Sequence, residues 1–445
     1  MIHTYASEFI AFLVAVVLCF TYFYVKPLYL GSDLSFTDNV IMICTSLAAC
    51  RFMAQGEKCK WPAGVDFSGR VALVTGSSSG VGYGVAEELA LHGWTVILAG
   101  PDSKRLLTAK EKILRKVARK YRKVDKKDQP QVIVLGTVDL SSEQSVRDYA
   151  QCVNHVRHKY PLALLVNAAG TLSRHLDYGK DGFENIEKMV ATNAVGPLLL
   201  SELLLPALEH CADLSGVSSR IVNVASSCHT FLGFPKKPYK ELDYPLQMLY
   251  GTERSSPHYN THRHSTVSAE KADSCTPFLL EDLPPLNFVG YYGLSKLCVV
   301  WNTRILAQKV SNLYFSPTAE IENADDESNE GKTTGRGTQQ HLKVFVACCH
   351  PGIITTHLYR DLFPNWVLDY IIYYPSLLVG KTWREGAQAA LKPAVETSTM
   401  IHGGYYLCSG EYGADSGVSC VSSYGSNMVL AMGYYQWVKE LLSKN

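Results

Sequence analysis

The sequence predicts an α/β fold: a doubly wound parallel sheet with helices on both faces, preceded by an N-terminal membrane helix. From residue 70 onward, short apolar runs alternate with longer helical stretches, which is typical of a parallel sheet covered on both faces. A glycine-rich turn joins the first apolar run to the first helical stretch, and an uncharged stretch lies near the N-terminus. These features divide the chain into an anchor (residues 1–30), a juxtamembrane segment (residues 31–65) and one large domain (residues 66–445).

The anchor is predicted from Phe9–Val25, which has no charged residue and is followed at once by Lys26. As a helix this stretch is about 25 Å long, enough for a thin bilayer. A cleaved signal peptide is the alternative, but neither a basic start nor a small-residue cleavage site is present. The sequence therefore favours a retained single-pass anchor.

The juxtamembrane segment contains a second apolar run, Val40–Cys50, which is too short to span a bilayer. It is interpreted as interfacial or as packed against the next domain. Positive charge follows it at Arg51, Lys58 and Lys60, whereas the extreme N-terminus has none. The positive-inside rule then places the large domain on the cytoplasmic side.

Six apolar runs of the large domain are predicted strands, beginning at Arg70, Thr95, Val132, Leu162, Arg220 and Leu342. The first run leads into TGSSSGVG, Thr75–Gly82, and then into a helical stretch. A strand, a glycine turn and a helix in this order indicate a Rossmann-type nucleotide site, because the backbone has to approach a pyrophosphate closely. The predicted cofactor contacts here are Gly76, Ser77, Ser78, Gly80, Val81 and Gly82.

Composition excludes some classes of function. A net charge of +1 with 47% hydrophobic residues gives no sign of a nucleic-acid partner. The 13 cysteines contain no CxxC pair and are interpreted as reduced thiols. His258, His262 and His264 lack a cysteine or acidic partner at tight spacing, so no metal site is predicted.

A tyrosine and a lysine four residues apart, Tyr292 and Lys296, form a candidate proton-transfer pair. Such spacing places both side chains on one helix face, where an ammonium group lowers the pKa of a nearby phenol. Tyr291 would project about 100° away around the helix. The same spacing at Tyr22–Lys26 and Tyr435–Lys439 is assigned to the membrane boundary and to helix packing.

These motifs resemble the short-chain dehydrogenase/reductase family: the threonine-glycine turn, NAAG at Asn167–Gly170, and the later tyrosine-lysine pair, in the family's order. RIVNVAS, YGLSKL, HPGIITT and REGAQAA look most like its retinol-dehydrogenase-like branch. The resemblance implies that Tyr292 is the general acid/base, that Lys296 supports it and contacts the cofactor ribose, and that Ser226 stabilises the substrate oxygen, with Ser227 as the neighbouring alternative.

The resemblance also implies further site residues. Asn193 would hold a water that links the lysine to solvent, and a helix-capping amide is the alternative for this residue. Asn167 and Gly170 would line the ribose side of the cofactor. Asp139 would contact the adenine, and Thr356 the nicotinamide amide.

The cofactor choice depends on Gly100, which stands where an NAD-specific protein usually carries an acid. Its absence favours NADP(H) over NAD(H). Pro101 replaces the arginine that often follows in this branch, so a 2′-phosphate would need Ser77, Ser103, Lys104 or Arg105.

Three stretches depart from the family pattern. Inserts are expected at about 232–286, which is polar and could flank the substrate cleft, and at 316–340, which is acidic and expected to be disordered. The basic run from Lys110 is interpreted as a solvated crossover helix, with Ile113, Leu114, Val117, Tyr121 and Val124 along one side; contact with an anionic membrane face is the alternative.

Together these features predict a membrane-anchored enzyme that interconverts a lipophilic alcohol and its aldehyde or ketone; a retinoid, steroid, polyprenoid or fatty aldehyde would fit. The endoplasmic reticulum and the lipid-droplet surface both suit such a protein, and a homodimer is left open. A catalytically inactive nucleotide-binding scaffold with partner-binding inserts is the rival hypothesis, and a reductase of soluble substrates is a third.

Overall fold

The computed structural model describes residues 44–45, 47–48, 51, 55–175, 177–230, 287–311, 342–354, 358, 380–396, 401–407 and 421–443. The predicted anchor and both predicted inserts lie outside this part of the chain. Within Val40–Cys50, the four described residues are helical and exposed, with Leu47 exposed to 42%. At these four positions the run is not packed against the large domain.

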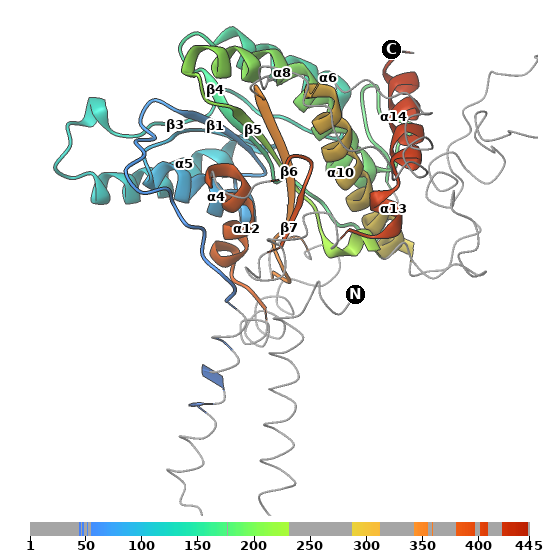
Figure 1. Cartoon of the computed structure of the whole chain (residues 1–445), viewed down its shortest axis with the longest axis horizontal. Helices are drawn as coiled ribbons and strands as arrows, with labels where there is room; N and C mark the ends of the chain where they lie inside the picture. Colours follow the sequence, from blue (N-terminus) through green and yellow to red (C-terminus); the bar gives the residue numbers. More distant parts are fainter. Residues whose placement is uncertain are drawn as a thin grey trace, which may run out of the picture.

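Seven parallel strands form the central sheet in the order β3-β2-β1-β4-β5-β6-β7 (Figure 1). The chain moves outward from β1 to β3, then crosses back to β4 and continues to the other edge, so the doubly wound α/β prediction is confirmed. The strands are β1 (Val71–Thr75), β2 (Thr95–Ala99), β3 (Val132–Ile133), β4 (Leu162–Asn167), β5 (Ser219–Val224), β6 (Val344–His350) and β7 (Tyr405–Leu407).

The last strand was not among the six predicted from the sequence. β7 is only three residues long, and it pairs with β6 from Cys348↔Tyr405 to His350↔Leu407. A run this short shows no clear periodicity, because two or three apolar residues fit a strand, a helix or a loop equally well. Its pairing is decided by the neighbouring strand.

Helices cover both faces of the sheet (Figure 1). One face carries α4 (Gly80–Leu91), α5 (Ser103–Lys120) and α12 (Trp383–Val395); the other carries α6 (Glu143–His155), α8 (Gly196–Ser215) and α10 (Asn287–Val310), with α14 (Met428–Ser443) packed outside α10. Short helical elements are η3 (Lys126–Asp128), α7 (Lys188–Val190), a π-helical turn η4 (Ala191–Val195), η5 (Ser227–Thr230) and α13 (Ser423–Ser426).

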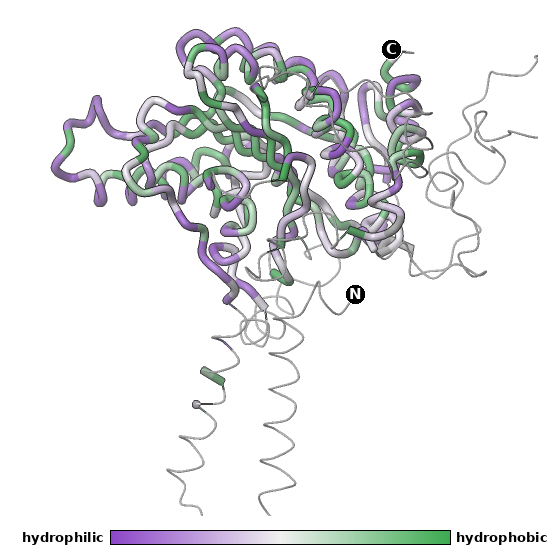
Figure 2. Tube along the Cα trace, viewed as in Figure 1, coloured by the Kyte–Doolittle hydropathy of each residue, from purple (hydrophilic) through white to green (hydrophobic). Residues whose placement is uncertain are grey.

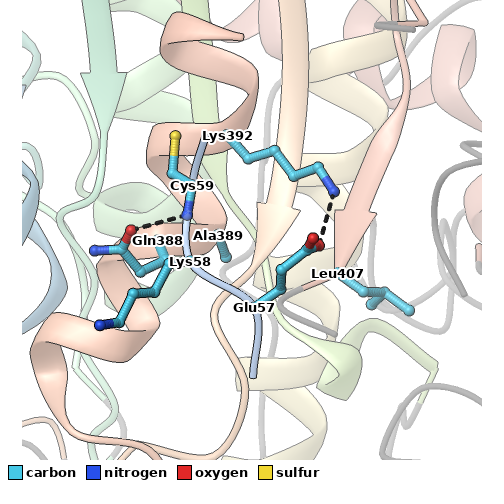
Figure 3. Close-up of a pocket in the computed structure, with 7 residues that line it drawn as sticks. All are labelled: Glu57, Lys58, Cys59, Gln388, Ala389, Lys392 and Leu407. Carbon is cyan, nitrogen blue, oxygen red and sulfur yellow. Dashed lines mark hydrogen bonds and ion pairs between the residues drawn. The ribbon is translucent and has the colours of Figure 1, made fainter. Parts of the chain in front are cut away.

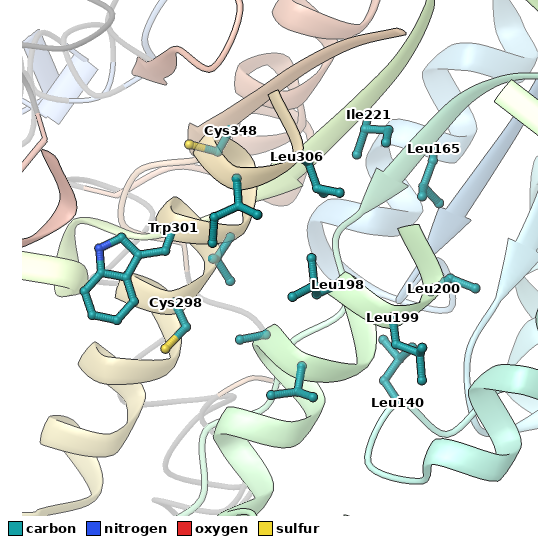
Figure 4. Close-up of a cluster of buried hydrophobic side chains, with 14 of the residues drawn as sticks. Leu140, Leu165, Leu198, Leu199, Leu200, Ile221, Cys298, Trp301, Leu306 and Cys348 are labelled. Carbon is teal, nitrogen blue, oxygen red and sulfur yellow. The ribbon is translucent and has the colours of Figure 1, made fainter. Parts of the chain in front are cut away.

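Strand residues alternate between two buried clusters, one on each face. In β1, Val71 and Leu73 join the cluster beneath α8 and α10, whereas Ala72 and Val74 join the cluster beneath α4 and α12. Figure 4 shows part of the first cluster, with leucines of α8 and Leu306 of α10 close to Leu165 and Ile221 of the sheet. Figure 2 shows the same arrangement as apolar strands inside and polar helix surfaces outside.

One helix among the described residues, Lys188–Ser215, is long and apolar enough to cross a membrane by length and composition. In its most apolar window, 78% of the residues are buried inside the domain. It contains α8, which packs against β4, β5 and α6. Its apolar character therefore belongs to the core of the domain.

The basic run from Lys110 begins inside α5, the crossover helix between β2 and β3, and continues past the end of that helix at Lys120 into η3. Ile113 and Val117 are buried against α4 and the sheet, as predicted. Leu114 and Tyr121 are partly buried beside them, while Val124 is exposed beyond the helix end. The lysines and arginines point mainly to solvent, as expected of a solvated crossover helix.

Hydrogen bonds and ion pairs connect the end of the juxtamembrane segment, residues 51–59, to α12 and to the residue Gly380 before it. The guanidinium of Arg51 pairs with the Glu385 carboxylate and donates to the Gly380 carbonyl. The Cys59 N–H donates to Gln388 Oε1 at 3.0 Å, and Lys392 pairs with Glu57. Figure 3 shows a small pocket between this segment and α12, none of whose lining residues belongs to the predicted active site.

Candidate active site

The predicted pair Tyr292 and Lys296 lies on α10, where the helix packs against η5 and β6. Lys296 Nζ is 5.7 Å from the centroid of the Tyr292 ring, as the one-turn spacing predicts. The ammonium group also donates a hydrogen bond of 3.0 Å to the carbonyl oxygen of Val224, the last residue of β5. Both side chains are buried, and both are held at the carboxyl end of the sheet.

Burial strongly changes the acidity of this lysine. Removal from water lowers the pKa of Lys296 to about 8, against the opposing influence of the Cys228 and Cys349 thiols. At neutral pH the lysine is still cationic. It can therefore favour a phenolate on the neighbouring tyrosine.

Ser226 follows β5 and lies two residues beyond the carbonyl that Lys296 contacts. Its hydroxyl oxygen accepts a hydrogen bond of 3.2 Å from the Cys228 N–H. Ser227 is more deeply buried, at 2% exposure against 9% for Ser226. The lower accessibility of Ser227 favours Ser226 as the predicted oxygen stabiliser.

Asn193 lies in the π-helical turn before α8, a geometry often found at functional positions. Its amide exchanges two hydrogen bonds with the backbone of Thr171, of 2.7 and 3.0 Å, and donates a third to Ser295 Oγ. Ser295 in turn donates to the Tyr292 carbonyl. The side chain thus joins the loop after β4 to α10 and does not cap its own helix, which argues against the capping alternative.

Gly170 lies between this asparagine and the lysine. A Cβ atom at Gly170 would be 3.5 Å from both Asn193 Oδ1 and Lys296 Nζ. Gly170, the end of NAAG, is therefore close enough to contact both Asn193 and Lys296. These two predicted catalytic residues are more than one hundred positions apart in the chain. The fold thus brings Asn193 and Lys296 together at one site, as predicted for catalytic residues.

The glycine turn between β1 and α4 has a shape suited to a dinucleotide. Gly76 has φ +65°, and a Cβ there would be 2.7 Å from the Ala169 backbone. A Cβ on Gly82 would be 2.6 Å from the Gly76 carbonyl oxygen. Because only glycine fits, the backbone stays open at the N-terminus of α4, where N–H groups attract phosphate. The residues present thus fit a pyrophosphate-containing cofactor.

Two side chains hold this turn in place, and one of them was missed by the sequence analysis. Thr75 Oγ1 accepts hydrogen bonds of 3.1 Å from the N–H groups of Ala168 and Ala169, so it ties the glycine turn to NAAG. Ser77 is fully buried and exchanges hydrogen bonds with the Ala99 backbone at the end of β2. The only feature of the sequence that pointed to a role for Thr75 is its position directly before the first glycine of the turn.

Asn167 has a different environment from the one predicted. Its amide donates to Ser201 Oγ at 2.9 Å and to Asn223 Oδ1 at 2.8 Å, and Asn223 donates onward to Thr303. These residues form a buried polar network between the sheet and the helices α8 and α10. The side chain of Asn167 is engaged inside the domain, so a contact with the cofactor would have to come from the backbone of its turn.

Asp139 and Arg105 are the side chains predicted to contact the adenosine end of the cofactor. The Asp139 carboxylate accepts from the Ser141 N–H and hydroxyl at 3.0 and 2.6 Å. Partial burial raises its pKa, but these hydrogen bonds and Lys180 outweigh that and keep the carboxyl pKa below its usual value. Arg105 Nη2 donates to Ser79 Oγ at 3.3 Å, which places a cation beside the glycine turn. Thr356 lies outside the described residues.

Comparisons with known proteins agree with this geometry. Residues 70–239 match the family model for short chain dehydrogenases. The chain is 33% identical over 367 residues to short-chain dehydrogenase TIC 32 B of Brassica napus, covering 82% of this chain and 87% of that protein. It is 32% identical over 342 residues to polyprenol dehydrogenase of Homo sapiens, covering 76% of each.

A third relative is retinol dehydrogenase 11 of Homo sapiens, 33% identical over 166 residues, which cover 37% of this chain and 45% of that protein. The resemblance of the sequence motifs is thus confirmed by these three relatives and by the family model. The chain belongs to the short-chain dehydrogenase/reductase family, in its retinol-dehydrogenase-like branch, and is an oxidoreductase that works with a nicotinamide cofactor.

Proposed function

We propose that this protein is a membrane-anchored, NADP(H)-dependent oxidoreductase that interconverts a lipophilic alcohol and its aldehyde or ketone. The observation that carries the proposal is the meeting of Tyr292, Lys296 and Asn193, from distant parts of the chain, beside the end of β5 and Ser226. This grouping lies next to a turn shaped for a dinucleotide. The domain boundaries proposed are an anchor at residues 1–30, a connecting segment at 31–65 and the catalytic domain at 66–445.

In the proposed mechanism, the nicotinamide cofactor supplies or accepts the hydride. The Tyr292 hydroxyl gives its proton to the substrate oxygen during reduction and takes it back during oxidation. The Lys296 ammonium, 5.7 Å from the tyrosine ring, stabilises the phenolate that forms. Ser226 stabilises the developing charge on the substrate oxygen by hydrogen bonding. Asn193 supports the tyrosine through Ser295, which contacts its backbone.

The preference for NADP(H) is supported by the surroundings of the adenosine end. Gly100, at the end of β2, offers no carboxylate to ribose hydroxyls. Arg105, held by Ser79 at the glycine turn, supplies a cation suited to a 2′-phosphate. Ser77, another candidate for this contact, is fully buried and engaged with Ala99. We assign the phosphate to Arg105 because it contacts the glycine turn through Ser79.

The proposed substrate class is supported by the names of the relatives, a polyprenol dehydrogenase and a retinol dehydrogenase, whose substrates are lipophilic alcohols. The uncharged Phe9–Val25 stretch supports the membrane anchor. A substrate that partitions into a bilayer suits an enzyme fixed at its surface. A cytoplasmic orientation is proposed from the charge distribution. The endoplasmic reticulum and the lipid-droplet surface are the membranes proposed, since both suit an enzyme of lipophilic substrates.

The test is turnover by the full chain in detergent, followed by NADPH or NADH oxidation with retinal, a polyprenal, steroid ketones and aldehydes of increasing length. The Tyr292→Phe variant should lower kcat by about 10²- to 10⁴-fold without loss of cofactor binding. Tyr291→Phe is the matched control, since its side chain points to another side of the same helix. Unchanged turnover in Tyr292→Phe, or a preference for short soluble carbonyls, would contradict the proposal.

A further inference from the structure

His229, three residues after Ser226, is fully buried in η5 and has a backbone group at each ring nitrogen. Nδ1 lies 2.7 Å from the Ser226 carbonyl oxygen. Nε2 lies 3.2 Å from the N–H of Ser422, almost two hundred positions further along the chain. The ring packs against Tyr405 of β7, with ring centroids 5.1 Å apart.

The two partners determine which ring nitrogen carries the proton. A carbonyl oxygen only accepts hydrogen bonds, so Nδ1 has to be the donor towards Ser226. A backbone N–H only donates, so Nε2 has to be a bare acceptor towards Ser422. The ring is therefore in the neutral Nδ1–H form. Burial lowers the pKa of His229 and outweighs the opposing effect of the bond to Ser226, which agrees with a neutral ring.

The same contacts link the two halves of the predicted catalytic site. The Ser226 carbonyl also accepts from the His229 backbone N–H at 3.1 Å, while the Cys228 N–H holds the serine hydroxyl. Two residues beyond Ser422, the Tyr424 carbonyl accepts from the indole N–H of Trp301 at 2.9 Å. Trp301 is on α10, the helix that carries Tyr292 and Lys296.

We propose that His229 is a positioning residue: its Nδ1–H holds the carbonyl group, and so the peptide, of Ser226 in place, while the contact with Ser422 keeps the ring in the Nδ1–H form. The proposal rests on the proposed function for the role of Ser226. His229 itself is not a catalytic residue, because its ring nitrogens are both engaged with backbone groups. Its effect on catalysis is indirect: by holding the Ser226 carbonyl it fixes the backbone that carries the serine hydroxyl within hydrogen-bond reach of the substrate oxygen.

Two substitutions separate the two ring contacts. The amide group of asparagine overlaps Nδ1 of histidine, so His229→Asn can still donate to the Ser226 carbonyl but cannot reach Ser422. The amide group of glutamine overlaps Nε2, so His229→Gln can still accept from Ser422 but not donate to Ser226. His229→Asn leaves the Ser422 N–H without its ring partner, whereas in His229→Gln the Ser226 carbonyl keeps the backbone N–H of residue 229, so the stability of each variant is measured beside its activity.

The experiment measures kcat, cofactor affinity and the thermal midpoint of the full chain carrying each substitution. His229→Gln should lower kcat about tenfold with cofactor affinity unchanged, whereas His229→Asn should stay within about threefold of wild type, because misplacement of a reacting group costs rate more than binding. In a Ser226→Ala background the effect of His229→Gln should disappear, because the group being positioned is gone. Equal losses of kcat in both variants, or a loss that persists in Ser226→Ala, would overturn the proposal.

A second measurement does not need turnover, and so it separates failure of this proposal from failure of the proposed function. Nitrogen NMR of ¹⁵N-histidine-labelled protein, with His229→Asn used to assign the signal, reports the tautomer directly. A neutral Nδ1–H ring at pH 7 supports the positioning contact even if no substrate is found. An Nε2–H ring or a cationic ring at pH 7 overturns it, whatever the activity.

Discussion

Replacing Lys296 with methionine tests the electrostatics at the centre of the site. The lysine is 4% exposed, and its pKa is lowered from 10.5 in the unfolded chain to about 8 in the fold by removal from water. Because the folded pKa lies below the unfolded one, the unfolded chain holds a proton that the folded chain releases between about pH 8 and pH 10.5. The free energy of unfolding therefore rises with pH in that window, and the cost of the buried charge is fully present below it.

The size of the effect follows from the shift. A difference of about 2.5 pKa units corresponds to about 3 kcal/mol of destabilisation at neutral pH. Between pH 7 and pH 9 the folded lysine loses its proton, and about 1 kcal/mol of that cost is recovered. Lys296→Met has no such charge. It also loses the hydrogen bond to the Val224 carbonyl, but this loss is the same at both pH values.

The assay is chemical denaturation of wild type and Lys296→Met, without cofactor, at pH 7 and pH 9. The free-energy difference between the two proteins should change by about 1 kcal/mol in favour of wild type at the higher pH. Titrating groups remote from residue 296 behave alike in both proteins and cancel in the comparison. A difference that stays constant, or moves in favour of the variant, would show that the lysine does not titrate with a lowered pKa.

Three further changes test other parts of the site. Arg105→Gln should raise KM for NADPH about tenfold and leave KM for NADH unchanged, since one charge-assisted hydrogen bond is lost; equal changes for both cofactors would contradict the assignment. Gly82→Ala should weaken cofactor binding about tenfold or more in a fluorescence titration, because its Cβ would be 2.6 Å from the Gly76 carbonyl oxygen. Gly136→Ala is the control and should bind the cofactor normally, since no atom lies within 4 Å of a Cβ at that position. Asn167→Ala should lower the free energy of unfolding, measured by chemical denaturation, by about 1–3 kcal/mol, because Asn223 on β5 and Ser201 on α8 each lose a buried hydrogen bond. A variant as stable as wild type would show that this network does not stabilise the fold.

Local order in the chain was sufficient for several features of this protein. The alternation of apolar runs and helical stretches predicts the parallel sheet, because the hydrophobic periodicity of a strand or a helix depends only on residues close together in the chain. The glycine spacing predicts the turn, since steric limits on φ act within one residue. The closeness of Tyr292 and Lys296 follows from helix geometry, and the 5.7 Å separation agrees with it. Their selection over Tyr435 and Lys439, which have the same spacing, rests on the family resemblance.

Contacts between distant segments decided the rest. Asn167 belongs to the NAAG motif, yet only the fold shows that its amide faces Ser201 and Asn223 instead of the cofactor side. The link from His229 to Ser422 spans almost two hundred positions, and no periodicity in the sequence marks it. A hydrogen bond between distant residues depends on the positions of whole strands and helices, whereas sequence patterns record only neighbours along the chain. The sequence therefore determined six of the seven strands, the glycine turn and the one-turn spacing of Tyr292 and Lys296, while the tertiary structure decided which polar side chains lie around them.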